Sequence, residues 1–543
     1  MRSLSIDKIN ANRANWWALL ILVLVVALLF VQAPHGGAFY WSDAPRHALN
    51  GVFVKDLLLD LPLDDPAGYA YRYYAQYPAL TILFYPPLFY AISAPFYALL
   101  GVSHEVALFV VFLHYVAYGL GCFVLARFWL SAIPSLAFAL LMVLLPEIAF
   151  WGRQVMLEIP AFAFLVWSAV ALMRYVRGSS SGWLYLCAGL LVCALYTKIS
   201  VAYVGVVYLV ILIQHERLSL LRNKHLYAVA ALSAIALLPL AVLTVKFGQA
   251  NVQSVTGIAD TVASRLTLEA WLWYAKQIPS QVGWPLTVLA CLGMAYALLQ
   301  TWRKSESAKA LTFWVLWFVV GYLFFSSIDL KEARHSVFLL APVVFVGVWF
   351  LDTLLSKKWV ASALCLAVAS TAATTVFERP VFYIKGYAEA VDLIAKKAPR
   401  DSVVLFSGYR DGSFIFNMRA REDRRDLSVL RADKILLSVA VRRELGVEEK
   451  SLSEAEIAQT LNDNGVHYVV MQPGFWTDLE AMLRFERVMA TPQFEEVARV
   501  STPANHKAHE TELVIYRNNG TVAPKPINRE IELKIINRSI STN

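Results

Sequence analysis

The sequence predicts an all-α polytopic membrane domain followed by a soluble α/β domain. Of its 543 residues, 58% are hydrophobic and 16% are charged, whereas soluble proteins are about 45–50% apolar and about 25% charged. Apolar runs of membrane-spanning length recur between residues 16 and 377, and short β-rich runs with many charges replace them from residue 380 onward. This composition excludes disorder, a coiled coil and a small disulfide scaffold.

The first apolar run, residues 16–33, follows a head that carries Arg2, Lys8 and Arg13. Its length is close to the ~20 residues needed to cross a bilayer, so we expect a signal anchor with a cytoplasmic N-terminus. With ten later runs, this gives about 11 predicted transmembrane helices. The later runs are 105–127, 131–150, 157–176, 183–197, 199–213, 226–246, 284–302, 309–327, 335–352 and 359–377.

Residues 83–100 are also apolar, but three prolines interrupt them and their aromatic residues suit an interface. We therefore predict a helix that lies at the membrane surface. With this choice, every basic loop falls on the cytoplasmic side, as the positive-inside rule requires. The net charge of +8 is then explained by topology, and no nucleic-acid partner is predicted. These loops carry Arg127, Arg174, Arg177, Arg217, Arg222, Lys224, Arg303, Lys304, Lys309, Lys357 and Lys358.

The C-terminal part alternates short β-rich and helical patterns. We predict a transmembrane domain over residues 1–378, an extracytoplasmic α/β domain over 379–520 and a flexible tail over 521–543. The expected strands are 402–407, 413–418, 466–472, 493–500 and 511–517, and the expected helices are 383–398, 454–464 and 477–489. The five cysteines all lie in apolar runs without metal-ligand spacing, so neither a disulfide framework nor a zinc site is predicted.

The first outward loop places an acid directly after the first membrane helix. Asp43 follows an aromatic cluster and precedes Arg46 and His47. At the membrane surface an ionised carboxylate can act as general base toward an acceptor hydroxyl or amine. The alternative is a solvated acid that caps a helix over residues 45–60.

Two further clusters are predicted to face outward. Glu158 opens a membrane helix, where an acid is costly unless it is paired or exposed to a polar cavity, and Arg153 is its candidate partner. Lys331, Arg334 and His335 lie between two apolar runs, where the two cations can hold a phosphate. The alternative is a set of side chains that snorkel to the interface. Lesser candidates are Lys198, Tyr77, Tyr85, Arg72 and residues 265–273.

Five short motifs occur in a definite order. They are Trp41–His47, Tyr85–Leu88 with its Pro-Pro-Leu, Arg153–Glu158, Leu195–Lys198 and Lys331–His335. Together they resemble the GT-C membrane glycosyltransferases that use polyprenyl-phosphate sugars, in particular the protein O-mannosyltransferases and the bacterial aminoarabinose lipid A transferase. Ala44 stands where many members of that family carry Glu, and Tyr85 where relatives often carry Lys or His.

The resemblance implies an inverting transfer of a sugar from a polyprenyl-phosphate donor to a glycolipid, glycan or protein acceptor on the extracytoplasmic face. Its site residues would be the catalytic acids Asp43 and Glu158 and a substrate-binding set. That set is Arg46, His47, Tyr85, Arg153, Lys198, Lys331, Arg334 and His335. No metal site is predicted. The resemblance leaves a divalent metal possible, but Ala44 removes the paired carboxylate that would favour one. Membrane lipid is the expected surrounding, in a bacterial inner membrane.

Two other classes of function fit the same hydropathy. A lipid or solute transporter or flippase would show internal repeats and ionisable residues in mid-membrane, whereas this chain has no obvious repeat and its acids cluster in outward loops. An inactive scaffold of the same fold would keep the hydropathy and lose catalysis. The sequence shows no Walker loop, dinucleotide fingerprint, His-Glu-x-x-His or Gly-x-Ser-x-Gly, so nucleotide-driven chemistry finds no support.

Overall fold

A computed structural model describes residues 13–178, 180–255, 265–302, 306–439, 443, 446–523, 530–533 and 538–541. The chain forms two compact units, each built from separate stretches of sequence. The first unit combines Met1–Ala33, Val111–Leu243 and Val255–Val381, and the second combines Pro34–Val110, Thr244–Ser254 and Phe382–Asn543. The predicted boundary between residues 378 and 379 stays a prediction. The first outward loop thus belongs to the same unit as the C-terminal α/β region.

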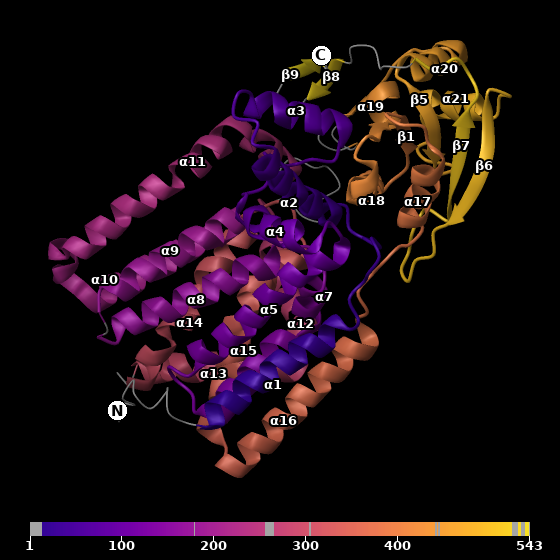
Figure 1. The fold of residues 1–543 in the computed structure, drawn as a ribbon. Coiled ribbons are helices and arrows are strands. Elements are labelled where there is room, and N and C mark those ends of the chain that lie inside the picture. The colour runs from indigo at the N-terminus through magenta and orange to yellow at the C-terminus, as the bar shows by residue number, and fades with distance from the viewer. Residues whose placement is uncertain are drawn as a thin grey trace. The chain divides into compact units, whose positions relative to one another are not determined.

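The first unit is helical. Figure 1 shows its long helices in magenta and salmon, with α8 and α9 side by side. Its helices are α1 (Arg13–Phe30), α6 (Ala132–Leu144), α7 (Pro146–Gly152), α8 (Glu158–Val176), α9 (Gly182–Thr197), α10 (Tyr203–Glu216), α12 (Leu268–Val282), α13 (Trp284–Trp302), α14 (Glu306–Ser326), α15 (Val337–Leu354) and α16 (Lys357–Ala373). Two more helices, α5 (His104–Ala126) and α11 (Lys224–Val255), have residues in both units.

Six helices among the described residues are long and apolar enough to cross a membrane. They are His104–Ala126, Glu158–Val176, Ile199–Arg222, Lys224–Gly248, Ala333–Leu354 and Lys357–Glu378. The bent pair α6 and α7 would make a seventh span, and five further apolar helices have only 10–17 residues. The structure therefore shows an integral membrane architecture, and the predicted count of about 11 spans is not confirmed.

The predicted run 131–150 is broken. Its two halves, α6 and α7, meet at an angle of 60°. Pro146 starts α7, and Leu145 before it has an extended backbone with φ −53° and ψ 130°. A proline has no N–H to donate and disfavours helical geometry in the residue before it, so the helix has to end there.

Helix α11 shows why a membrane is required. Leu232, Ile235, Leu238 and Val242 are 44–69% exposed along it. Such a large apolar surface is unfavourable in water, and lipid tails would cover it. Inside the unit, by contrast, aromatic rings fill the space between helices, and the Trp314 and Phe345 rings stack with centroids 4.2 Å apart.

The second unit contains a five-stranded mixed sheet in the order β2-β1-β5-β7-β6. Strand β1 pairs in parallel with β2 and β5, and β7 pairs antiparallel with β5 and β6. The strands are β1 (Val403–Ser407), β2 (Ser428–Arg431), β5 (Val466–Met471), β6 (Phe494–Ser501) and β7 (Glu512–Asn518), with β3 (Leu437–Val439) and β4 (Val447–Glu449) as a separate pair. Figure 1 shows this sheet in orange and yellow.

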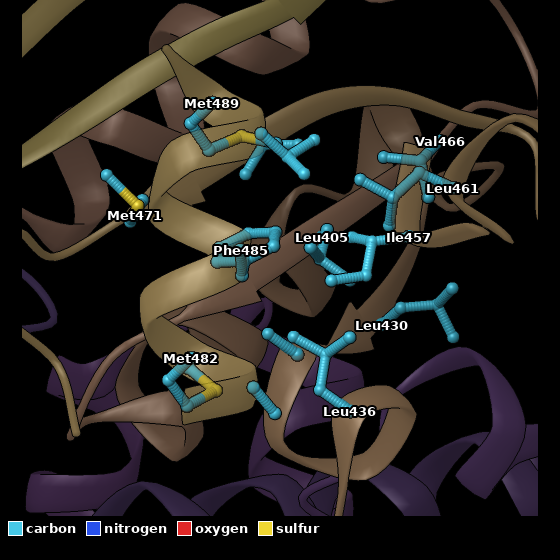
Figure 2. Packing of buried hydrophobic residues seen from close by; sticks show 14 of the residues in the cluster. Leu405, Leu430, Leu436, Ile457, Leu461, Val466, Met471, Met482, Phe485 and Met489 are labelled. Atoms are coloured by element: carbon cyan, nitrogen blue, oxygen red, sulfur yellow. The ribbon is translucent and has the colours of Figure 1, made fainter. Parts of the chain in front are cut away.

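Helices cover this sheet and bury its core. They are α17 (Tyr387–Lys397), α18 (Asp411–Ala420), α19 (Ala432–Leu436), α20 (Glu454–Asp463) and α21 (Glu480–Met489). In Figure 2, Met482, Phe485 and Met489 of α21 lie over Leu405 and the side chains around it. The buried residues of α21 recur at the spacing of one helical face, which is why this short helix docks firmly.

One predicted strand is wrong. Residues 413–418 were expected to be extended, but they lie within α18. Because β1 and β2 are parallel neighbours, the chain between them has to cross over, and a helix usually makes that crossing. The β-rich composition of the run reflects its burial, since α18 is buried along most of its length.

The remaining elements of the second unit come from the first loop and the tail. They are α2 (Asp43–Asp60), α3 (Pro66–Gln76) and α4 (Leu88–Leu100), with β8 (Glu530–Leu533) and β9 (Arg538–Ser541) as an antiparallel pair in the tail. Helix α4 occupies most of the predicted surface helix 83–100. A Cβ on Gly51 of α2 would lie 2.9 Å from the Tyr97 ring of α4, so the two helices approach closely there. The flexibility of the tail stays a prediction.

Candidate functional site

The predicted site residues fall into two sets, one in each unit. The first unit holds Arg153, Glu158, Lys198, Lys331, Arg334 and His335. The second unit holds Asp43, Arg46, His47 and Tyr85. Each set is described within its own unit.

Glu158 is the buried centre of the first set. It opens α8, and its carboxylate accepts a hydrogen bond of 2.8 Å from the ammonium of Lys198, which ends α9. The Glu158 side chain is 1% exposed and that of Lys198 is 20% exposed. The Oε2 atom of Glu158 is buried and has no hydrogen-bond partner among the described residues. A buried acceptor without a partner is costly, which marks this oxygen as a candidate ligand contact.

Arg334 supplies a second cation to Glu158. It lies in the 3₁₀ turn η4 (Ala333–Ser336), and it interacts electrostatically with Glu158, as Lys198 does. Its guanidinium also pairs with Glu332 and lies 5.7 Å from the ring centroid of Trp151. Because its side chain is 18% exposed, Arg334 keeps access to a ligand.

The 3₁₀ turn η4 is itself anchored from α12. Gln281 donates to the carbonyl of Ala333 at 3.0 Å, and Ser336 donates to Gln281 at 2.9 Å. His335 lies in the same turn and is close to the charges of Lys198, Arg334 and Glu158. The sequence offered no signal for Gln281, because its role depends on a contact 52 to 55 positions away.

Lys331 binds the protein backbone in this structure, and its predicted contact with substrate stays a prediction. Its ammonium donates to the carbonyls of Phe325, Ser326 and Ile328, at the C-terminal end of α14. Burial lowers the pKa of Lys331. An ammonium has three donors, and these carbonyls occupy all three. In this arrangement Lys331 closes the end of a helix, and its predicted contact with a phosphate would require it to leave these carbonyls.

Arg153 does not pair with Glu158 among the described contacts. It is fully buried and donates to the carbonyl of Ala149 at 2.8 Å, to Gln32 at 3.1 Å and to the carbonyl of Arg379 at 3.4 Å. These bonds tie α7 to the end of the first helix and to the segment that follows α16. They give Arg153 a structural task, and its predicted contact with substrate stays a prediction.

In the second unit, Asp43 is the first residue of α2. His47 follows one turn later, and its Nδ1 is 2.8 Å from the hydroxyl of Tyr90. The ring centroid of Tyr85 lies 4.6 Å from that of His47. Asp43 acts electrostatically on Tyr90, so the acid, the imidazole and both tyrosines gather in one place. Residues three and four apart share a helix face, which explains the grouping.

Arg46 is paired with the C-terminal region. It donates to both carboxylate oxygens of Asp411, at 2.9 and 2.8 Å, and to the carbonyl of Ser42 at 2.8 Å. Arg431 binds the same carboxylate at 2.6 Å. Burial raises the pKa of Asp411, but the charges of Arg431 and Arg46 outweigh it and hold the pKa below its ordinary value. The predicted role of Arg46 in substrate binding stays untested, since the observed partner is a carboxylate of the protein.

A second, fully buried ion pair links the same two segments. Arg419 of α18 binds Asp56 of α2 through two nitrogens, and the side chains are 0% and 1% exposed. Tyr73 donates to Asp56 at 3.0 Å, and Lys55 pairs with Glu422 at 2.7 Å. Sequence reasoning missed Asp56, Arg419 and Asp411. The only sequence signal for Asp56 and Arg419 was a high density of charges in 55–60 and 419–426, which does not identify partners, and Asp411 lies outside both ranges.

The same unit contains a small cleft with a volume of about 200 Å³. Its lining is both aromatic and charged, and it includes Arg72 and Tyr77, which were lesser candidates. The lining residues are Asp60, Tyr69, Arg72, Tyr73, Gln76, Tyr77 and Arg425. Within the described residues, no group of three or more His, Cys, Asp or Glu side chains is arranged to hold a metal ion.

Comparison with known proteins defines the class of fold. The sequence profile of the dolichyl-phosphate-mannose-protein mannosyltransferase family matches residues 85–243, and a sequence search of curated proteins finds no significant match. The structures that resemble the chain are GT-C glycosyltransferases. The predicted resemblance to the GT-C glycosyltransferases is therefore confirmed, and the chain has their fold.

The individual structures cover almost the whole chain. The structure of ArnT from Cupriavidus metallidurans in the apo state matches with a TM-score of 0.61 and 14% identity, over 95% of this chain and 100% of that chain. A structure of the same protein bound to undecaprenyl phosphate matches equally well. The oligosaccharyltransferase of Archaeoglobus fulgidus matches with a TM-score of 0.54 and 10% identity, over 93% and 76% of the two chains.

Proposed function

We propose that this protein is a membrane glycosyltransferase that transfers a sugar from a polyprenyl-phosphate donor to an acceptor, with inversion. The observation that carries the proposal is the cluster of Lys198 and Arg334 around the buried Glu158, in a fold shared with a protein that binds undecaprenyl phosphate. A pair of partly exposed cations next to membrane helices is what a lipid-linked phosphate requires.

In this proposal Lys198 and Arg334 bind the phosphate of the donor. Arg334 offers a planar fork of donors and Lys198 a compact point charge. Glu158 holds Lys198 in place, and its Oε2 atom, which has no hydrogen-bond partner in the described part of the chain, accepts a hydrogen bond from a hydroxyl of the sugar. Lys331 stabilises the neighbouring end of α14 by donating to the carbonyls there.

Asp43 is the proposed general base. It removes the proton from the acceptor hydroxyl or amine while that atom attacks the anomeric carbon, and the bond from the anomeric carbon to the phosphate oxygen breaks. The electron pair of that bond leaves with the polyprenyl phosphate, which needs no proton. Stabilising the developing phosphate charge is therefore the larger task, and it falls to Lys198 and Arg334. His47 contacts Tyr85 and Tyr90, and Asp43 acts electrostatically on Tyr90, so these residues lie near the proposed base.

The proposed topology follows the charges of the loops. The N-terminus lies in the cytoplasm, the α/β region lies outside, and the membrane is a bacterial inner membrane. The acceptor is a glycolipid, a glycan or a protein, and the α/β region helps to bind it. Positive-inside counting supports this orientation.

The test is turnover of a lipid-linked donor. Purified full-length protein in lipid nanodiscs is incubated with a panel of undecaprenyl-phosphate hexoses and pentoses and a bacterial envelope extract as acceptor source. Mass spectrometry then follows free undecaprenyl phosphate. We expect release from at least one donor, dependent on the extract. If no donor in the panel is consumed faster than in empty nanodiscs, the proposed function is wrong.

A further inference from the structure

Helix α18 of the C-terminal region runs against the segment that carries Asp43. Asn417 donates to the carbonyl of Gly37 at 3.3 Å. The ring centroids of Phe416 and Phe39 lie 5.2 Å apart. Because these contacts come from one helix, α18 acts as a rigid support for residues 37–46.

The first turns of α18 and α2 approach each other most closely. A Cβ on Gly412 would lie 3.1 Å from Cγ of Pro45, a tight contact that a larger side chain could enter only if Pro45 shifted by a few tenths of an ångström. One residue earlier, Asp411 receives two hydrogen bonds from Arg46. The side chain of Arg46 is 18% exposed and that of Asp411 is 9% exposed, so water competes little for this pair.

Arg46 connects Asp411 to the backbone next to Asp43. Its other terminal nitrogen donates to the carbonyl of Ser42, the residue directly before Asp43. Ser42 makes no capping hydrogen bond through its own side chain at the start of α2. The first turn of α2 is thus fixed by Arg46, and Arg46 is fixed by Asp411.

We propose that Asp411 is a positioning residue for the transfer reaction: by holding Arg46 it fixes the first turn of α2 and with it the carboxylate of Asp43. This inference rests on the proposed function of Asp43. It assigns the C-terminal region a direct task in the reaction, in addition to any role in binding an acceptor.

The test compares steady-state kinetics of full-length variants with the donor identified above. For Asp411→Asn, which keeps the shape and removes the charge, we expect kcat to fall roughly 10-fold to 100-fold. The KM for the donor should change little, because Lys198 and Arg334 lie on other elements. Asp411→Glu restores the charge and should recover part of the lost kcat.

Asp56→Asn is the matched control. Asp56→Asn also removes a negative charge from a contact between α2 and α18, the buried pair of Asp56 with Arg419. This pair lies about 20 Å along α2 from Asp43. All variants are assayed at least 10 °C below the melting temperature of the least stable one. We expect Asp56→Asn to melt earlier and to keep the wild-type kcat, whereas a merely structural role of Asp411 would give both variants the same profile.

Gly412→Ala gives an independent perturbation if Asp411→Asn does not fold. The added methyl group requires the ring of Pro45, or α18 itself, to shift by a few tenths of an ångström without any change of charge, and we expect kcat to fall again. Wild-type kcat in Asp411→Asn, or in both Asp411→Glu and Gly412→Ala when the former is not obtained, would overturn the inference. An active Asp43→Asn protein would instead remove Asp43 as the general base, and a failure to consume any donor would overturn the proposed function, so the failures can be told apart.

Discussion

Replacement of Asp43 by Asn is expected to reduce sugar transfer by about 10²-fold to 10⁴-fold, the usual contribution of a positioned general base. Asn has nearly the same shape and makes similar hydrogen bonds, but it cannot take up the acceptor proton. Donor binding should be unchanged, because the proposed phosphate ligands Lys198 and Arg334 are untouched. The measurement is the initial rate of undecaprenyl phosphate release at saturating donor.

Asp64→Asn is the control for that experiment. It makes the same substitution at an exposed acid of the same loop. We expect wild-type rates from this variant and an unchanged melting temperature from both. Near-normal transfer by Asp43→Asn would remove Asp43 from the mechanism and would move the search for the base to other acids.

Replacement of Arg419 by Ala is expected to cost roughly 3–5 kcal/mol of folding free energy. The substitution leaves the buried carboxylate of Asp56 without its main partner, in a place that water does not reach. Burial opposes the charge of Arg419, but Tyr73 and Asp56 outweigh it and raise the pKa of Arg419, so the guanidinium stays charged at any accessible pH. Thermal melting of the full-length protein in detergent should show a large decrease.

Arg499→Ala is the comparison for this loss of stability. Arg499 also pairs with two acids, Glu496 and Glu512, but its side chain is 52% exposed. Solvent screens such pairs, so melting should change little. Equal shifts for Arg419→Ala and Arg499→Ala would contradict the view that the buried pair holds α2 and α18 together.

The sequence predicted what depends on local pattern and composition. Apolar length and hydropathy indicated a helical membrane protein, although the predicted count of about 11 spans is not confirmed, and the order of short motifs indicated the GT-C fold. It also predicted Glu158 and Lys198 as site residues without pairing them; the structure shows the pair, and their role in a site stays a prediction. The α/β character of the C-terminal region followed from runs such as 402–407 and 466–472, which form β1 and β5 almost as expected.

The rest depends on contacts between distant residues. Asp411 and Arg46 are 365 positions apart, and no local pattern connects them. Lys331 is a different case, because its partners are carbonyls only three to six positions before it, at the end of α14, and its charge alone did not indicate them. Helix α18 was mistaken for a strand because burial on a sheet and extended structure favour the same residue types. Pro146 is a local sequence signal for the bend, but the apolar run 131–150 was long enough to be interpreted as one continuous span.

The most direct test of the account is binding of undecaprenyl phosphate to the purified protein, measured by native mass spectrometry. The comparison is between wild type and Lys198→Ala/Arg334→Ala, with Lys357→Ala/Lys358→Ala as a control that removes the same charge from two exposed residues at the start of α16. We predict that wild type and control retain the lipid and that Lys198→Ala/Arg334→Ala loses at least about 10-fold in affinity, equivalent to 1.4 kcal/mol. Equal binding by all three proteins, or binding by none, would contradict a polyprenyl-phosphate site at Lys198 and Arg334.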